Sequence, residues 1–247
     1  MNAEDTTNDR VVLVTGASRG IGAGVARQLL GRGLRVAGTY RSGGDLVEKL
    51  AAGAPGRVLP VAFDLAAPDM AETLVAHVAG HWGRLDSLVL NAAVWRGGKL
   101  ARIDPGDWWR VIEDNLRSTA ALVRAAIPRL IEGENPSVVL VGSAVGSVGF
   151  PGDTAYASVK AAAIGFARSL AKELAPQGVR VNVLAPGFVE TDMTAAIPDG
   201  ARQRIAEATL LGRFGTVEEI ASAAVFLAED ATFCTGAVLA ADGGWTL

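Results

Sequence analysis

The chain has 247 residues, and its 23 Lys and Arg against 26 Asp and Glu give a formal net charge of −3. This balance excludes a protein that binds nucleic acid without regard to sequence. The single cysteine, Cys234, cannot form an internal disulfide, and no apolar run approaches the ~20 residues of a membrane-spanning helix. The polar start MNAEDTTNDR resembles neither a signal nor a transit peptide. We therefore expect a soluble, cytoplasmic protein, with a loose tail over 1–10 and a single domain over 11–247.

Short apolar runs alternate with segments of helical periodicity along the whole chain. The β-branched run Val11–Val14 is typical of a strand buried on both faces, and a glycine-rich turn and a helix over Gly24–Gly31 follow it. Six further strands are expected, at Val36–Thr39, Val58–Phe63, Leu88–Leu90, Val138–Val141, Val179–Leu184 and Ala237–Ala240. Helices are expected near 45–52, 69–80, 107–131, 155–175 and 217–228. This order predicts a doubly wound α/β fold, with a mainly parallel seven-stranded Rossmann-type sheet and helices on both faces.

The first strand ends in a turn suited to a phosphate. Its sequence Thr15-Gly-Ala-Ser-Arg-Gly-Ile-Gly22 allows close approach of the backbone, and the helix that follows offers free N–H groups to an anion. A pyrophosphate is therefore expected over Gly16, Ser18, Arg19, Gly20, Ile21 and Gly22.

The end of the second predicted strand bears on the choice of cofactor. An NAD site usually has an acid about 20 residues after the glycine turn, to bind the ribose 2′-hydroxyl. This chain has Tyr40-Arg41-Ser42 there instead, and no acid before Asp45. Arg41, together with Arg19, suits a 2′-phosphate, which favours NADP(H).

A predicted helix carries Tyr156 and Lys160 one turn apart, on the same face. An ammonium beside a phenol lowers the pKa of the phenol, so that Tyr156 becomes an acid suited to protonating a developing alkoxide. Ser143 follows the strand Val138–Val141 and is placed to donate a hydrogen bond to the same carbonyl oxygen. The pattern indicates reduction of a ketone.

Taken together, these motifs resemble the short-chain dehydrogenase/reductase family from about Val11 to the C-terminus. The nucleotide turn over Thr15–Gly22 matches, as do Asp64 after the third strand and Pro186-Gly187 after the sixth. Asn91-Ala92-Ala93 stands where the family usually has Asn-Ala-Gly. The family's catalytic tetrad is matched by Asn115, Ser143, Tyr156 and Lys160, with Ser143 and Tyr156 separated by the usual 13 positions.

The resemblance implies a role for each matching residue. Lys160 is expected to bind the nicotinamide ribose and Asn115 to hold a water that links Lys160 to solvent. Further cofactor contacts are expected from Arg41, Ser42, Asp64, Leu65, Asn91, Ala92, Ala93, Tyr156, Lys160, Pro186, Gly187, Val189 and Thr191. The substrate is expected to meet Ser143, Val145, Trp95, Phe150, Phe188 and Met193, with 188–212 as a lid.

Within the family, the phrase Pro186-Gly-Phe-Val-Glu-Thr-Asp-Met-Thr194 is very similar to the 3-oxoacyl-[acyl-carrier-protein] reductases. This likeness implies a homotetramer and a 3-oxoacyl thioester or polyketide-like substrate, carried by an acyl carrier protein or by CoA. The places where such reductases commonly have arginines for docking the carrier protein hold Glu134 and Gln177, which counts against that partner, although Arg124, Arg129 and Lys172 are nearby.

Two other functions stay open at this point. One is an alcohol dehydrogenase of the same family that acts on a small free alcohol, sugar or steroid, and the other is a non-catalytic NADP-binding sensor. The intact tetrad argues against the sensor. No metal site is expected, because His77 and His81 have no third ligand near them in the sequence.

Overall fold

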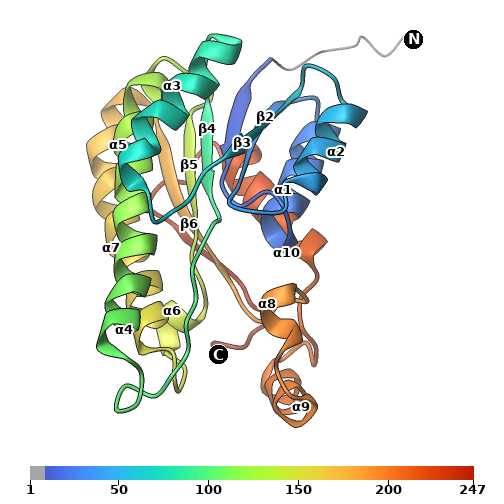
Figure 1. Cartoon of the computed structure of the whole chain (residues 1–247), viewed down its shortest axis with the longest axis vertical. Helices are drawn as coiled ribbons and strands as arrows, with labels where there is room; N and C mark the ends of the chain where they lie inside the picture. The colour runs from blue at the N-terminus through green and yellow to red at the C-terminus, as the bar shows by residue number, and fades with distance from the viewer. Residues whose placement is uncertain (1–8) are drawn as a thin grey trace.

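The computed structural model of the chain describes residues 9–247 (Figure 1). These residues form one seven-stranded sheet in the order β3-β2-β1-β4-β5-β6-β7, and every pair of neighbouring strands is parallel. The predicted fold class is confirmed. The strands are β1 Val11–Val14, β2 Arg35–Tyr40, β3 Val58–Ala62, β4 Ser87–Leu90, β5 Ser137–Val141, β6 Arg180–Pro186 and β7 Val238–Ala241.

Helices cover both faces of the sheet, α3, α5 and α7 on one side and α1, α2 and α10 on the other (Figure 1). The α-helices are α1 Gly20–Gly31, α2 Asp45–Gly53, α3 Ala71–Trp82, α4 Pro105–Ile112, α5 Ser118–Ile131, α6 Val145–Val148, α7 Thr154–Leu174, α8 Asp192–Ala195, α9 Asp199–Ala208 and α10 Val217–Val225. Short 3-10 helices lie at Pro68–Met70 and Ala175–Gln177, and π-helical segments at Glu113–Arg117 and Phe226–Asp230. None of the helices in the described range is long and apolar enough to cross a bilayer.

The strands bury side chains on both faces, as their unbroken apolar runs predict. Leu13 packs with α3, α5 and α7, whereas its neighbours Val12 and Val14 pack with α1 and α10. All three side chains are fully buried. Burial on both faces fixes the sheet rigidly, so that the loops at its carboxyl edge are held in defined positions.

Arg10 corrects the expected tail over 1–10, of which residues 1–8 lie outside the described part. Its guanidinium is buried and forms an ion pair with Glu229. It also donates to the carbonyl oxygens of Glu134 and Asn135. Arg10 therefore belongs to the folded domain, because a buried charge needs these partners.

Several predicted elements have different bounds. The expected helix over 107–131 is an unbroken rod made of α4, the π-helical segment Glu113–Arg117 and α5. The segment 188–212 contains α8 and α9, and α6 is a single turn that was not predicted. Such short helices depend on tertiary contacts more than on periodicity, which explains why the sequence pattern missed them.

Candidate active site at the carboxyl edge of the sheet

The glycine-rich turn lies between β1 and α1, at the point where the strand order reverses from β1 to β4. Gly16 and Gly20 have φ angles of +68° and +53°, which a glycine adopts without strain. The turn is fastened to β4, because the Asn91 amide donates to the carbonyl oxygens of Thr15 and Gly16 at 3.0 and 3.2 Å. The Thr15 hydroxyl accepts from the Asn91 and Ala92 backbone N–H groups, both at 3.0 Å.

The same turn fits the phosphates of a dinucleotide. A Cβ added at Gly22 would lie 2.2 Å from the Gly16 carbonyl oxygen, so the backbone here is packed as closely as glycine permits. Arg19, which precedes α1, is extended and makes no side-chain cap. The first N–H groups of α1 therefore have no side-chain cap from Arg19 and are placed to bind an anion.

The residues expected around the adenosine end lie after β2 and β3. Arg41 and Ser42 are exposed directly after β2, and the Arg19 side chain is also exposed, with its guanidinium 3.7 Å from Asp192. Asp64 is half-buried and accepts from the Ala66 N–H at 3.0 Å. The Leu65 carbonyl oxygen accepts from the Ser118 hydroxyl. Leu65 packs with the core between the sheet and α3, α5 and α7, so the end of β3 lies toward those helices.

Three residues of the expected tetrad converge at the end of β5. Tyr156 and Lys160 lie one turn apart on α7, and the Lys160 Nζ is 5.3 Å from the centre of the Tyr156 ring. Lys160 is buried and donates to the carbonyl oxygen of Val141, the last residue of β5, at 2.7 Å. Ser143 follows two residues later, and its hydroxyl accepts from the Val145 N–H at 3.2 Å.

The protonation of the pair differs from the expectation. Burial, with a smaller contribution from the Asp153 carboxylate, raises the pKa of Tyr156 well above its usual value. Burial lowers the pKa of Lys160 to about 8. The expected lowering of the Tyr156 pKa by Lys160 is thus wrong for this arrangement, because desolvation of the phenolate dominates and the Lys160 ammonium donates to Val141.

Asn115 lies in the π-helical segment between α4 and α5. Its buried side chain donates to the carbonyl oxygens of Val94 and Val111 at 2.8 and 2.7 Å, and it accepts from the Val94 N–H at 2.9 Å. A cavity of about 20 Å³ separates it from Lys160, with Ala92 and Val141 also in the lining. This volume is sufficient for one water molecule.

The loop after β6 completes this edge of the sheet. The Ala144 N–H donates to the Pro186 carbonyl oxygen at 2.8 Å, so that Gly187 leaves β6 beside Ser143. Val189 is buried, and Thr191 begins α8 with a capping box to Thr194. A Cβ at Gly20 would lie 3.5 Å from the Thr191 Cγ2, so the start of the segment 188–212 packs on the glycine turn.

The residues expected to meet the substrate lie on the segments that follow β4, β5 and β6. Trp95 is 47% exposed on the loop between β4 and α4, and Met193 is 51% exposed on α8. Phe150 and Phe188 are half-buried with ring centres 5.7 Å apart, whereas Val145 is buried at the start of α6. The structure thus brings Phe150 and Phe188 together, and it leaves Trp95 and Met193 more open to solvent.

Asp153 is a residue of this site that the sequence interpretation missed. Its carboxylate accepts from the Trp95 indole N–H at 2.9 Å, and its neighbours Gly152 and Thr154 accept hydrogen bonds from Gly98 and Trp108. The start of α7 is thereby joined to the loop after β4. The one available signal was an acid three positions before Tyr156, and only the fold shows what this acid contacts.

We predict that Asp153→Asn lowers the pKa of Tyr156, because the negative charge that disfavours the phenolate is removed. The chain has only two tyrosines, Tyr40 and Tyr156, so tyrosinate absorbance against pH reports both, and Tyr156→Phe assigns them. In the Asn variant, ionisation of Tyr156 should begin at a lower pH than in the wild type. Asp230→Asn, at an exposed ion pair with Arg32, is the control. An unchanged or later onset in Asp153→Asn would refute this contribution.

Comparison with known proteins agrees with this geometry. The protein family described as enoyl-(acyl carrier protein) reductase matches residues 16–246. A 3-oxoacyl-[acyl-carrier-protein] reductase of Salmonella typhimurium is 40% identical over 239 residues, which are 95% of this chain and 96% of the relative. The reductase of the same name from Thermotoga maritima is 40% identical over 238 residues, with 95% and 97% covered. Among solved structures, a double variant of a Serratia marcescens short-chain dehydrogenase/reductase is 32% identical, with a TM-score of 0.90 and 98% and 99% of the two chains covered.

Proposed function

The chain belongs to the short-chain dehydrogenase/reductase family, and on this premise we propose that it reduces the ketone of a 3-oxoacyl thioester to a secondary alcohol with NADPH. The family uses a nicotinamide cofactor, which supplies a hydride when it is bound. The observation that carries the proposal is that Lys160, one turn from Tyr156 on α7, donates to Val141 at the carboxyl end of β5, two residues before Ser143.

In this proposal Tyr156 is the general acid. A buried phenol is protonated at neutral pH, so Tyr156 holds the proton that the carbonyl oxygen takes up as hydride reaches the carbon. Ser143 donates a second hydrogen bond to that oxygen, which orients the ketone and stabilises the negative charge that develops there. The products are the secondary alcohol and the oxidised cofactor.

Lys160 and Asn115 have supporting roles. Lys160, held to Val141, is placed to bind the ribose of the cofactor and to return a proton toward Tyr156 after each turnover. The small cavity between Asn115 and Lys160 supports a water in this path. Because Asn115 uses its amide to hold the Val94 backbone, its side chain also fixes the width of this cavity.

The preference for NADP(H) rests on Arg41 and Arg19. Both side chains are exposed at the end of the site where the 2′-phosphate is expected, and an arginine binds a phosphate more strongly than a hydroxyl. Asp64, Leu65, Ala93 and the other expected cofactor contacts lie along the same edge of the sheet, which supports the proposed position of the cofactor.

We predict that Arg41→Ala raises the KM for NADPH by about tenfold, the usual effect of one lost charge-assisted hydrogen bond, and changes the KM for NADH far less. Steady-state rates with each cofactor at a saturating ketone concentration provide the measurement. Arg117→Ala, which removes an exposed arginine paired with Asp69, is the matched control. Equal changes in the KM for NADPH and for NADH would show that Arg41 does not bind the 2′-phosphate.

The substrate class is tested by a panel that contains acetoacetyl-CoA, the corresponding carrier-protein thioester and small free ketones. The proposal expects oxidation of NADPH with the thioesters at a rate well above that with free ketones. Faster turnover of a free ketone would favour the alcohol dehydrogenase of the same family. Tight NADPH binding without turnover of any ketone would favour the sensor.

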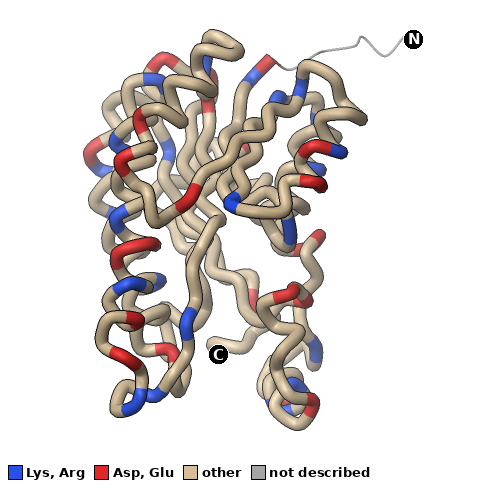
Figure 2. Tube along the Cα trace, in the orientation of Figure 1, with Lys and Arg blue, Asp and Glu red and all other residues tan. Residues whose placement is uncertain are grey.

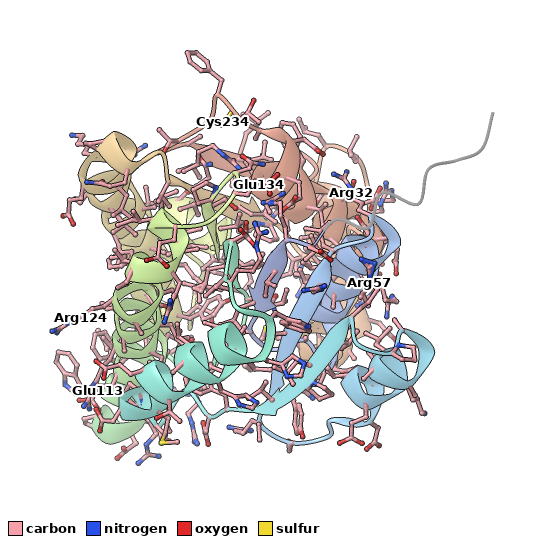
Figure 3. All side chains as sticks on the ribbon, turned by 90° about the horizontal axis from the view of Figure 1, so that it is seen from above. Arg32, Arg57, Glu113, Arg124, Glu134 and Cys234 are labelled. Carbon is pink, nitrogen blue, oxygen red and sulfur yellow. The ribbon has the colours of Figure 1, made fainter. Side chains whose placement is uncertain are left out.

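The carrier-protein thioester in this panel also tests the partner. Glu134 is in contact with Arg84 at the amino edge of the strands, whereas Arg124 points outward from α5 (Figure 3). In the view of Figure 2, basic and acidic residues of the described part of the chain are interspersed along the helices. Mixed charges of this kind attract an acidic carrier only weakly. We therefore propose that CoA thioesters serve as well as carrier-bound ones. The homotetramer that the family resemblance implies also stays a proposal.

A further inference from the structure

The last residues of the chain fold back onto the active-site edge. The Gly187 N–H donates to the carbonyl oxygen of Ala241, the last residue of β7, at 3.1 Å. The Asp242 carboxylate then accepts from the Gly244 N–H at 2.9 Å and from the Thr246 hydroxyl at 2.6 Å. This turn requires φ angles of +64° and +82° at Gly243 and Gly244. Figure 1 shows the C-terminus between α6 and α8.

The turn places Trp245 against two aromatic residues of the site. Its ring centre lies 5.2 Å from that of Phe188, nearly perpendicular to it, and 6.2 Å from that of Phe150. Phe188 is backed in turn by Phe214, whose ring is covered by the Arg202 guanidinium at 4.3 Å. Trp245, Phe150 and Phe188 thus form one aromatic surface, and each of these three residues is only half-buried.

This aromatic surface is linked along the chain to the catalytic residues. Phe150 lies on the segment that joins Ser143 to Tyr156, and Phe188 follows Pro186-Gly187, whose backbone is hydrogen-bonded to Ala144. Both rings therefore lie on segments that start from the end of the sheet where a ketone would be held by Ser143 and Tyr156. Partly exposed aromatic faces gain free energy when an apolar group covers them, in proportion to the area that is buried.

We propose that Trp245 determines substrate specificity, because its ring forms the part of the aromatic surface on which the apolar acyl chain of the substrate lies. This inference rests on the proposed function and adds the chain-length preference to it. Leu210 and Leu211 pack beside the same turn, since the Leu211 N–H donates to the Gly243 carbonyl oxygen at 3.0 Å. The C-terminal turn therefore also fixes the far end of the segment 188–212.

The test compares Trp245→Ala with the wild type on acetoacetyl-CoA and on 3-oxooctanoyl-CoA. We expect kcat/KM for the longer thioester to fall about tenfold or more, as for the loss of contact with two or more methylene groups, and that for acetoacetyl-CoA to change less than threefold. Trp245→Phe should recover most of the loss. Phe233→Ala is the control, because this fully exposed ring lies before the opposite end of β7. Equal losses on both thioesters, or a gain on the longer one, would overturn the proposal.

A binding measurement keeps this role separate from the catalytic proposal. Calorimetric titration with 3-hydroxyoctanoyl-CoA and 3-hydroxybutyryl-CoA needs no turnover. We expect Trp245→Ala to weaken binding of the longer ligand selectively. If the wild type reduced no ketone and this selective loss persisted, the proposed reaction would fail while the chain-length role of Trp245 stood. If Trp245→Ala bound both ligands like the wild type, the specificity role would fail even with full activity on acetoacetyl-CoA.

Discussion

Tyr156→Phe is expected to lower kcat for reduction of acetoacetyl-CoA by roughly 10²–10⁴-fold, the usual contribution of a positioned general acid. The substitution removes only the phenolic oxygen, and the ring still packs in α7 beside the Lys160 side chain. Binding of NADPH, followed by its fluorescence, should therefore stay within a few-fold of the wild type. This loss of kcat with intact cofactor binding would distinguish a catalytic group from a structural one.

Tyr40→Phe provides the matched control for this variant. Tyr40 is the other tyrosine of the chain, half-buried at the end of β2, where its ring packs against Gly44. Its hydroxyl has no part in the proposed reaction, so kcat should stay near the wild-type value. A Tyr156→Phe variant that kept more than a tenth of the wild-type kcat would contradict the assignment of Tyr156 as the acid.

Gly22→Ala is expected to have the second largest effect, on cofactor binding. The added methyl would lie 2.2 Å from the Gly16 carbonyl oxygen and 2.5 Å from the Asn91 amide nitrogen. The Gly16 carbonyl oxygen belongs to the turn, and the Asn91 amide holds the turn to the end of β4 by hydrogen bonds. The turn must therefore deform to admit the methyl. We expect NADPH binding to weaken by at least about tenfold and the free energy of unfolding to fall by ~1–3 kcal/mol, as in other overpacked sites.

Gly31→Ala in the same helix is the control for this substitution. A Cβ at Gly31 would meet no atom within 4 Å, so the change should leave NADPH binding unaltered. Its expected effect on stability is neutral or slightly favourable, up to ~1 kcal/mol, since alanine restricts the unfolded chain more than glycine does. Urea unfolding and NADPH titration of both variants provide the measurements. If Gly22→Ala bound NADPH as tightly as the wild type, the glycine-rich turn would not be the phosphate-binding site.

The fold was predictable because its signals are local. Val11–Val14 and Val138–Val141 are unbroken apolar runs. The glycines after Thr15 lie in the turn between the first strand and the first helix, where a dinucleotide-binding sheet has its tight turn. The close packing of Gly22 against Gly16 agrees with the motif that singled out this turn. The elements without a strong pattern, such as α6 and α8, were the ones missed, because neighbouring segments hold them in place.

The chemistry of the site was less predictable, because it depends on burial and on contacts between distant segments. Spacing alone placed Tyr156 and Lys160 on one face of a helix, but it did not show that Lys160 donates to Val141. As a result, the pKa of Tyr156 was expected to fall, whereas burial raises it. Likewise, the turn at Asp242 brings the Trp245 ring into contact with the Phe188 ring, and no sequence motif predicts this contact.

The most direct test of the proposed ketone reduction follows the hydride from NADPH to the product. NADPH that carries two deuterium atoms on the reactive carbon of its nicotinamide is incubated with acetoacetyl-CoA and the wild-type protein, and the product is analysed by mass spectrometry and NMR. We expect one deuterium on the former carbonyl carbon of 3-hydroxybutyryl-CoA, and almost no product with Tyr156→Phe. Deuterium that stays on a bound cofactor, with no alcohol formed from any thioester or ketone, would contradict the proposed reduction.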